Sequence, residues 1–288
     1  MEDLKIIECP RDAMQGIKQQ IPTTTKVNYI NDLLKVGFDT IDFGSFVSPK
    51  AIPQLADTDK VLKKLDLSKT TSKLLAIVAN ERGADDACNF EEIDYLGYPF
   101  SISETFQQRN TNASIAKSVD RLEYIANTAK KHKKEVVVYL SMGFGNPYGD
   151  PWDSEVVIDW SRKINDRYGV KIIALSDTIG IATPGSITSL FNHLIPEMPD
   201  VEFGAHLHTT PETYDEKLKA SYNAGCRRFD GAIKGFGGCP MAKDELIGNM
   251  PTEKMVDWFD KHNISTGINR TVLEHAVQQS VYVFNHNQ

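Results

Sequence analysis

The stretch Phe203-Gly204-Ala205-His206-Leu207-His208 is an apolar run that ends in two histidines separated by one leucine. In a β-strand, residues two apart point to the same face, so a strand here would carry both imidazoles into one space. Two imidazoles on one rigid support suit a metal ion. The alternative is that one or both histidines are ordinary polar residues at a strand end. The rest of the chain is needed to choose between these two interpretations.

Short apolar or β-branched runs recur along the whole chain and alternate with longer amphipathic stretches. This alternation is typical of parallel strands joined by crossover helices. Eight such units in 288 residues predict an α/β fold, a (β/α)8 TIM barrel, with residues 1–288 as a single catalytic domain. The expected strands are Leu4–Cys9, Phe38–Phe43, Lys73–Val78, Glu92–Tyr98, Glu135–Leu140, Lys171–Leu175, Glu202–His206 and Arg227–Ile233.

An open doubly wound sheet is the competing fold. Its dinucleotide-binding form places a G-x-G-x-x-G motif after the first strand. Here we expect a loop that reads Cys9-Pro-Arg-Asp-Ala-Met-Gln15, without such glycines. The barrel is therefore the favoured interpretation.

Several helix starts are legible between the expected strands. Ser114 is a plausible N-cap for a helix whose apolar stripe is formed by Ile115, Val119, Leu122 and Ile125. Proline is compatible with a first helical turn, so helices are also expected to start at Thr183-Pro184 and at Pro251-Thr-Glu253. The stretch Thr271–Phe284 predicts an extra C-terminal helix after the eighth unit.

Composition and charge exclude some classes of partner. The chain is 41% hydrophobic and 25% charged, which is ordinary for a globular protein, and its formal charge of -7 argues against a nucleic-acid partner. No apolar run is long enough to cross a membrane, so we expect no membrane partner and a cytoplasmic location. The four cysteines lack C-x-x-C spacing and are expected to be free thiols. Barrels with an extra terminal helix often associate, which makes a homodimer possible.

Polar residues follow several of the expected strands, where the active site of a barrel lies. Asp12, His206, His208 and Asn249 form a mixed oxygen and nitrogen set that suits Mg²⁺ or Mn²⁺ better than zinc. The alternative for Asp12 is that it only pairs with Arg11 or caps the next turn. The other polar residues at these ends are Arg11, Asp42, Asp177 and Lys234.

Cys239 follows two glycines and precedes a proline, in a segment where the glycines could act as hinges. One interpretation is a lid thiol that donates a proton during chemistry. The other is a tight turn whose cysteine has no chemical role. The residues alone do not separate these two interpretations.

These motifs resemble those of the 3-hydroxy-3-methylglutaryl-CoA lyases, a family of metal-dependent TIM-barrel lyases related to Claisen-condensing enzymes. The resemblance covers residues 4 to 284 and is carried by motifs that, taken together, are highly specific. They are Pro10-Arg-Asp-Ala-Met-Gln15, Ser45-Phe-Val-Ser-Pro-Lys50 with Pro53-Gln54, Ser176-Asp-Thr-Ile-Gly180, Ala205-His-Leu-His208, Gly235-Phe-Gly-Gly-Cys-Pro240, and Gly248-Asn249 with Thr252-Glu253.

The resemblance implies a retro-Claisen cleavage of 3-hydroxy-3-methylglutaryl-CoA to acetoacetate and acetyl-CoA, as in leucine degradation. It implies that a divalent cation, Mg²⁺ or Mn²⁺, is bound by Asp12, His206, His208 and Asn249. Arg11 would stabilise the enolate, and Cys239 would donate the proton. Asp177 would occupy a catalytic position that holds an acidic residue, and Asp42 and Glu253 would orient metal ligands or water. Contacts with the acyl-CoA substrate are implied for Gln15, Lys18, Ser45 and Asn110.

The chain departs from the family pattern in several places. Asp42 stands where glutamate is usual, Thr209 where aspartate is common, and Met142 and Asn146 where cysteines are frequent. The segment Met241–Gly248 replaces a small, glycine-rich one beside Asn249. Three alternatives therefore stay open: a lyase for another short 3-hydroxyacyl-CoA, a condensing relative that adds acetyl-CoA to a 2-oxo acid, and a non-catalytic metal- or CoA-binding barrel.

Overall fold

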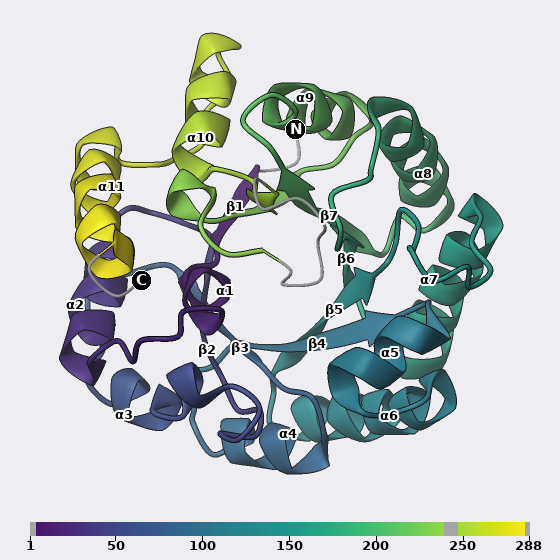
Figure 1. The fold of residues 1–288 in the computed structure, drawn as a ribbon, viewed down its shortest axis with the longest axis horizontal. Coiled ribbons are helices and arrows are strands. Elements are labelled where there is room, and N and C mark those ends of the chain that lie inside the picture. Colours follow the sequence, from purple (N-terminus) through teal and green to yellow (C-terminus); the bar gives the residue numbers. More distant parts are fainter. Residues whose placement is uncertain (1–3, 239–246, 286–288) are drawn as a thin grey trace.

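The computed structural model describes residues 4–238 and 247–285. Within them, eight parallel strands close into a barrel, because the order runs from β6 through β1 to β8 and β7, and β6 also pairs with β7. Figure 1 looks down this barrel, with the helices around it. The predicted fold is confirmed. The strands are β1 (Lys5–Glu8), β2 (Thr40–Ser45), β3 (Lys73–Ile77), β4 (Tyr95–Ser101), β5 (Glu135–Ser141), β6 (Ile172–Asp177), β7 (Glu202–Thr209) and β8 (Arg228–Gly231).

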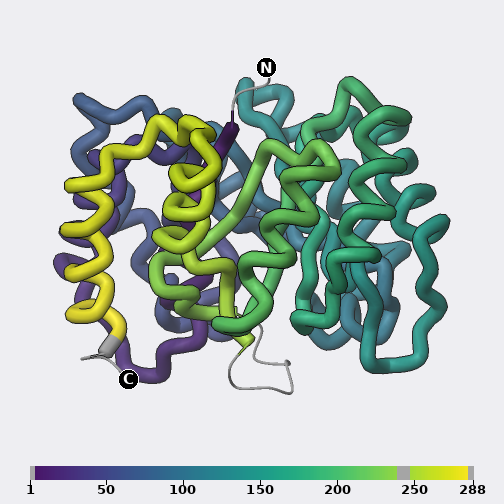
Figure 2. The backbone as a smooth tube through the Cα atoms, turned by 90° about the horizontal axis from the view of Figure 1, so that it is seen from above, coloured from purple at the N-terminus to yellow at the C-terminus, as the bar shows by residue number. Residues whose placement is uncertain are grey.

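The helices form an outer ring, which Figure 2 shows from the side. The expected C-terminal helix is present and packs beside α2, where it closes the ring between the last and first units. The helices are α1 (Pro10–Gln15), α2 (Thr23–Leu33), α3 (Thr58–Leu62), α4 (Glu81–Cys88), α5 (Glu104–Thr111), α6 (Ile115–Lys131), α7 (Ser154–Tyr168), α8 (Pro184–Glu197), α9 (Tyr214–Asn223), α10 (Thr252–Lys261) and α11 (Arg270–Asn285), with short 3₁₀ turns at Pro53–Leu55 and Ile233–Gly235.

The three expected helix starts are confirmed, two of them with side-chain caps and the third, α10 after Pro251, without one. The Ser114 hydroxyl accepts a hydrogen bond from the Lys117 backbone N–H at 3.2 Å, and Leu122 and Ile125 on the same helix are fully buried. Thr183 and Ser186 cap α8 reciprocally, just before the proline at its first position. In the described residues, no helix has the length and apolarity that a membrane span requires.

Strand β4 begins and ends three residues later than expected, and two further segments differ from expectation. The stretch after β1, expected as a loop, is helix α1, which begins at Pro10 because proline fits a first helical turn. Strand β7 continues past His206 to Thr209, so both histidines belong to it. The extension is supported by a short strand, β9 (Gly248–Asn249), which pairs antiparallel with its end and matches His208 with Asn249. The paired residues His208 and Asn249 are far apart in the sequence, so local sequence patterns did not predict this pairing.

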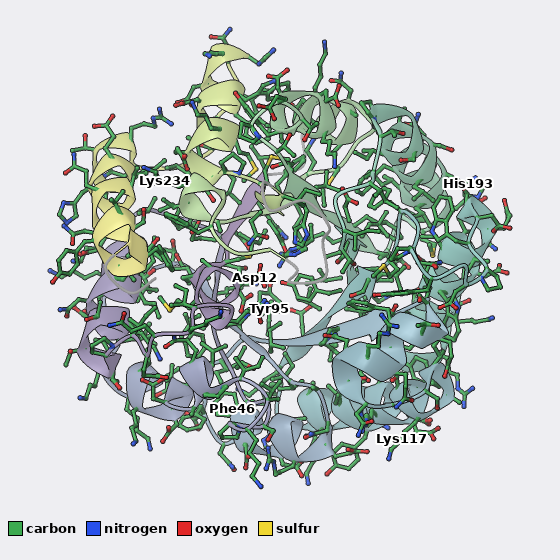
Figure 3. The ribbon with its side chains drawn as sticks, viewed as in Figure 1. Asp12, Phe46, Tyr95, Lys117, His193 and Lys234 are labelled. Carbon is green, nitrogen blue, oxygen red and sulfur yellow. The ribbon has the colours of Figure 1, made fainter. Side chains whose placement is uncertain are left out.

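The barrel interior has an apolar half and a polar half. Side chains from β3 to β6 form a small apolar cluster that includes Leu75, Tyr95 and Tyr139. Facing them, Arg228 of β8 lies over the Tyr95 ring at 5.8 Å, and His206 of β7 meets the Tyr139 ring edge-on at 5.3 Å. Figure 3 shows Asp12 and Tyr95 near the barrel centre. The polar half therefore lies on the strands that end in the predicted site.

Glu8, at the end of β1, is a buried carboxyl that joins three segments. It accepts hydrogen bonds from the Ile233 backbone N–H at 2.9 Å and from the Thr252 hydroxyl at 2.6 Å. Burial raises the pKa of Glu8 to about 8, although both hydrogen bonds act to lower it. Glu8 is thus a neutral acid at pH 7 that connects β1 to the start of α10.

This raised pKa predicts a pH-dependent stability. Between about pH 4.5 and 8 the unfolded chain has lost the Glu8 proton while the folded chain keeps it, so stability falls as pH rises through this window. The Glu8→Gln variant mimics the neutral acid and should lose this decline, which for one group is at most about 1.4 kcal/mol per pH unit. Urea unfolding at pH 5, 6, 7 and 8 measures it. Equal slopes in both proteins would contradict the prediction.

Candidate active site

The structure brings together three of the four predicted cation ligands as one cluster. Asp12 on α1 and His206 and His208 on β7 each offer a ligand atom, and these atoms all lie within 4.8 Å of one another. All three side chains border the same cavity. Because α1 begins directly after β1, Asp12 is held above the barrel beside the end of β7.

His208 is arranged as a neutral ligand. Its Nδ1 lies 3.0 Å from the carbonyl oxygen of Thr178, which can only accept, so Nδ1 carries the proton. Burial and the positive charge of His206 lower the pKa of His208 to about 4. Its Nε2 is buried and has no hydrogen-bond partner among the described residues. An imidazole lone pair buried without a donor is what a bound cation would satisfy.

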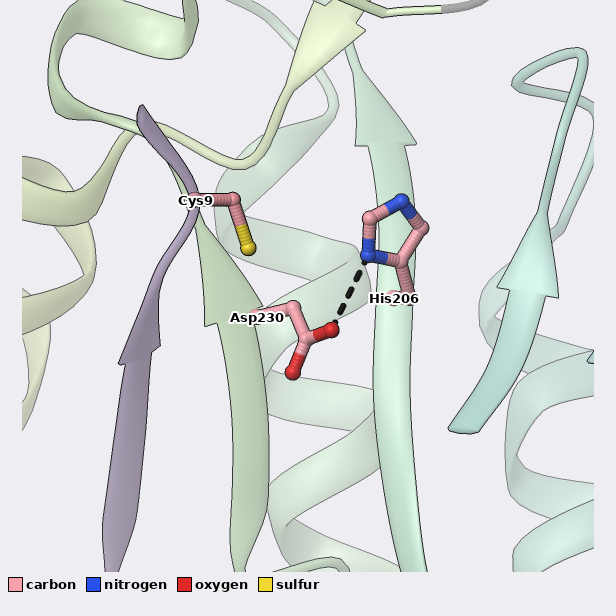
Figure 4. A group of neighbouring side chains, drawn as sticks. All are labelled: Cys9, His206 and Asp230. Atoms are coloured by element: carbon pink, nitrogen blue, oxygen red, sulfur yellow. Dashed lines mark hydrogen bonds and ion pairs between the residues drawn. The ribbon is translucent and has the colours of Figure 1, made fainter. Parts of the chain in front are cut away.

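His206 is oriented by a carboxylate that sequence reasoning missed. Its Nδ1 lies 3.1 Å from Oδ2 of Asp230 on β8, as Figure 4 shows. Burial acts to lower the pKa of His206, but the hydrogen bond and charge of Asp230 outweigh it and raise this pKa. A carboxylate on one imidazole nitrogen directs the other toward a metal. The signal that could have revealed Asp230 is the presence of an acidic residue within the apolar run Arg227–Ile233.

Asn249, the fourth predicted ligand, reaches the cluster through β9. Its Nδ2 donates to Oδ2 of Asp12 at 2.6 Å and to the carbonyl oxygen of Phe236 at 2.8 Å. This orientation leaves the side-chain carbonyl oxygen of Asn249 as the atom that could bind a cation. The four residues together offer carboxylate, amide and imidazole donors.

Arg11 is held rigidly beside this cluster. Its Nε and Nη2 form a two-point contact with Asp42, at 2.9 and 2.5 Å from Oδ2, and its Nη1 donates to Asp12 and to Gln15 at 2.9 Å each. Burial opposes the charge of Asp12, but Arg11 and the two histidines lower the pKa of that carboxyl to about 2. Asp12 is therefore an anion at neutral pH. The two roles predicted for it, cation ligand and partner of Arg11, are compatible with each other.

The cavity above these residues has a volume of about 520 Å³. Of the predicted substrate contacts, Gln15 and Asn110 line it. Sequence reasoning missed Tyr139, whose hydroxyl is buried without a partner in the described part of the chain, and the two cations Arg109 and Arg121. These residues lie within a strand and helices, where sequence alone gives no sign of the direction in which a side chain points.

Other predicted site residues lie outside the cavity lining. Asp177 accepts from Lys217 Nζ at 2.7 Å, and that ammonium also donates to the carbonyl oxygen of His208. Glu253 accepts from the Lys234 backbone N–H at 2.8 Å. Ser45 is buried at the end of β2, and Lys18 is exposed after α1. Cys239 and residues 241–246 of the substituted segment lie outside the described residues.

The model of the family described as HMGL-like matches residues 4–280. The chain belongs to the HMGL-like family. Among its relatives, hydroxymethylglutaryl-CoA lyase of Bacillus subtilis is 33% identical over 259 residues, which cover 90% of this chain and 85% of the relative. A 3-hydroxy-3-isohexenylglutaryl-CoA/hydroxymethylglutaryl-CoA lyase of Pseudomonas aeruginosa is 32% identical over 270 residues, covering 94% and 89%. The family resemblance seen in the motifs is thereby confirmed.

Solved structures of HMGL-like proteins share the whole fold. The crystal structure of HMG-CoA lyase from B. subtilis superposes with a TM-score of 0.92 at 31% identity, covering 99% of this chain and 95% of that one. HMG-CoA lyase of Acinetobacter baumannii, solved in complex with coenzyme A and 3-methylmalate, gives a TM-score of 0.90 at 29% identity, covering 99% and 92%. As an HMGL-like protein, the chain is an enzyme of the carbon–carbon lyase type.

Proposed function

We propose that this chain cleaves 3-hydroxy-3-methylglutaryl-CoA to acetoacetate and acetyl-CoA in a divalent-metal-dependent retro-Claisen reaction. The observation that carries the proposal is the cluster of Asp12, His206 and His208 next to a fixed guanidinium, Arg11, in one cavity. The lyase names of relatives over nine-tenths of the chain support the same reaction.

Asp12, His206, His208 and Asn249 would hold the cation. Two oxygen donors beside two imidazoles suit Mg²⁺ or Mn²⁺, and the unpartnered Nε2 of His208 fits such a ligand role. When bound, the ion would supply Lewis acidity toward the C3 hydroxyl and an acyl oxygen of the substrate. The proposal therefore covers both Mg²⁺ and Mn²⁺.

In the cleavage a base would take the proton of the C3 hydroxyl, which becomes the ketone as the C2–C3 bond breaks. Arg11 would stabilise the charge that then develops on the thioester oxygen. Asp42 fixes the guanidinium from behind through two contacts, so no reorientation is needed when the enolate forms. The proposal gives Cys239 the role of proton donor to the resulting carbanion. It also retains Asp177 and Glu253 as acidic groups that act through their neighbours: Asp177 holds Lys217 against the backbone of His208, and Glu253 holds the backbone of Lys234.

The coenzyme A portion would extend along the cavity away from the cation ligands. Gln15 and Asn110 are the predicted contacts that line this space, and Lys18 and Ser45 remain predictions from the family resemblance. Neither a condensing activity nor a non-catalytic barrel is favoured, since the relatives named above are lyases. A cytoplasmic location and a homodimer also remain predictions.

The test is acetoacetate release from metal-stripped protein given 3-hydroxy-3-methylglutaryl-CoA, with and without added Mg²⁺ or Mn²⁺. We expect release that depends on the metal and yields one acetyl-CoA per acetoacetate. Metal binding without release would reject this substrate. The same assay with 3-hydroxy-3-isohexenylglutaryl-CoA and other 3-hydroxyacyl thioesters would then identify the alternative, and no release from any of them would favour the non-catalytic barrel.

A further inference from the structure

A second group of potential metal ligands lies against the far side of His206. Cys9, His206 and Asp230 each offer one ligand atom, and these three atoms also lie within 4.8 Å of one another. Figure 4 shows the Cys9 sulfur and the Asp230 carboxylate on the Nδ1 side of the His206 ring. Neither Cys9 nor Asp230 lines the cavity, so this group lies behind the proposed cation site.

Polar atoms around this group lack the partners that burial normally requires. Asp230 is 3% exposed, and its Oδ1 has no hydrogen-bond partner among the described residues, while Oδ2 binds His206. The hydroxyl of Tyr139, whose ring packs on His206, is likewise buried and unpartnered in that part of the chain. Buried carboxylate and hydroxyl oxygens are rarely left unsatisfied, which points to a bound ligand here.

We propose that Cys9, His206 and Asp230 form a binding site for a thiophilic divalent cation such as Zn²⁺ or Cd²⁺, hereafter the thiol site. Thiolate, imidazole and carboxylate are the donors that zinc takes in proteins. Cys9 is 1% exposed. Its free thiol carries a proton, so metal binding forms a metal–sulfur bond and releases that proton to solvent.

The charges nearby select the kind of ion. Arg228, two residues before Asp230 on β8, is buried in the same interior, and its positive charge acts on Asp230. A hard ion such as Mg²⁺ would gain little from a carboxylate whose charge is already offset by a buried guanidinium nearby. A soft ion gains the strong bond to sulfur, so the thiol site should discriminate in favour of Zn²⁺ and Cd²⁺.

The thiol site and the proposed catalytic site share one imidazole. In the hydrogen-bonded state, Nδ1 of His206 carries the proton that Asp230 accepts, which leaves Nε2 for the cation in the cavity. A cation at the thiol site needs the Nδ1 lone pair, so the proton of the neutral ring must move to Nε2. The two sites therefore exclude each other, and a soft ion would inhibit by taking His206 away.

Titration of metal-free protein with Cd²⁺ tests this, read by the ultraviolet thiolate-to-Cd²⁺ charge-transfer band. We expect a band that saturates at one equivalent, and Cys9→Ser should abolish it and weaken Cd²⁺ binding by at least ~10–100-fold, the cost of losing even a supporting partner. Cys88→Ser, which removes another buried thiol, and Cys239→Ser should both retain the band. A band that survives in Cys9→Ser, or that disappears only in Cys239→Ser, would overturn the site.

Electron paramagnetic resonance of Mn²⁺ tests the exclusion independently of any lyase activity. Cd²⁺ should release bound Mn²⁺ from the wild-type protein at one equivalent, but only at far higher concentrations from Cys9→Ser. Retained Mn²⁺ binding in Cys9→Ser shows that this variant is folded, and Cys9→Ala replaces it if it is not. A Cd²⁺–thiolate band that forms while all Mn²⁺ stays bound would overturn the shared histidine.

Discussion

Acetoacetate release by the His208→Ala variant should fall to the level of the metal-free protein and should not respond to added Mg²⁺ or Mn²⁺. His208 offers a buried Nε2 with no partner in the described residues, and burial together with the charge of His206 keeps its ring neutral. Removing it takes away one of two imidazole ligands from a cation on which the proposed reaction depends. We expect a loss of at least about 10³-fold in kcat/KM, since the Lewis acid contributes several kcal/mol.

The matched control is His193→Ala. His193 lies on the outer face of α8, where its ring meets Glu197 at 2.9 Å, and Figure 3 shows it at the periphery of the barrel. This variant should retain wild-type activity and Mn²⁺ binding. Metal-responsive activity in His208→Ala close to that of His193→Ala would remove His208 from the catalytic site.

The Arg11→Lys variant should lose about 10²–10³-fold in kcat, with a much smaller change in KM. Lysine keeps the charge but has no planar fork, so it cannot contact Asp42 at two points while also donating to Asp12 and Gln15. The ammonium would be drawn toward one carboxylate and away from the thioester oxygen. The loss should fall on kcat because the negative charge on that oxygen develops only as the bond breaks.

Steady-state kinetics with saturating Mg²⁺ measures this split, and a Mn²⁺ titration shows whether the cation is still bound. Arg162→Lys is the control, because Arg162 is exposed on α7 and pairs with Glu197. An unchanged kcat in Arg11→Lys would show that charge alone suffices. A change confined to KM would assign Arg11 to substrate binding.

The sequence was most informative where one local rule decides the outcome. The spacing of His206 and His208 on an apolar run predicts that they share a face, and the structure places them on β7 with ligand atoms close to Asp12. Similarly, the position of Ser114 before an apolar stripe correctly located the start of α6. The periodicity of apolar residues and the capping of helices depend only on residues that are near in sequence. Both can therefore be interpreted before the fold is known.

Features set by distant pairings were beyond such rules. The strand pair of His208 with Asn249 depends on a register 41 residues apart, and the contact of Asp230 with His206 depends on which side of β8 faces inward. The location of Asp177 is similar: its position at the end of β6 was expected, but Lys217, which pairs with its carboxylate, comes from a helix 40 residues later. Only the closed barrel determines these partners.

The hydrogen bond between Asn249 and Asp12 spans 237 residues, and β1 pairs with β8 rather than with β2 alone. A chain emerging from the ribosome therefore presents Asp12 long before it presents Asn249, the partner of that carboxylate. Until then, β1 has one open edge and the two histidines have no complete set of neighbours. The site is therefore complete only after the segment that carries β8 and β9, residues 228–249, has been made.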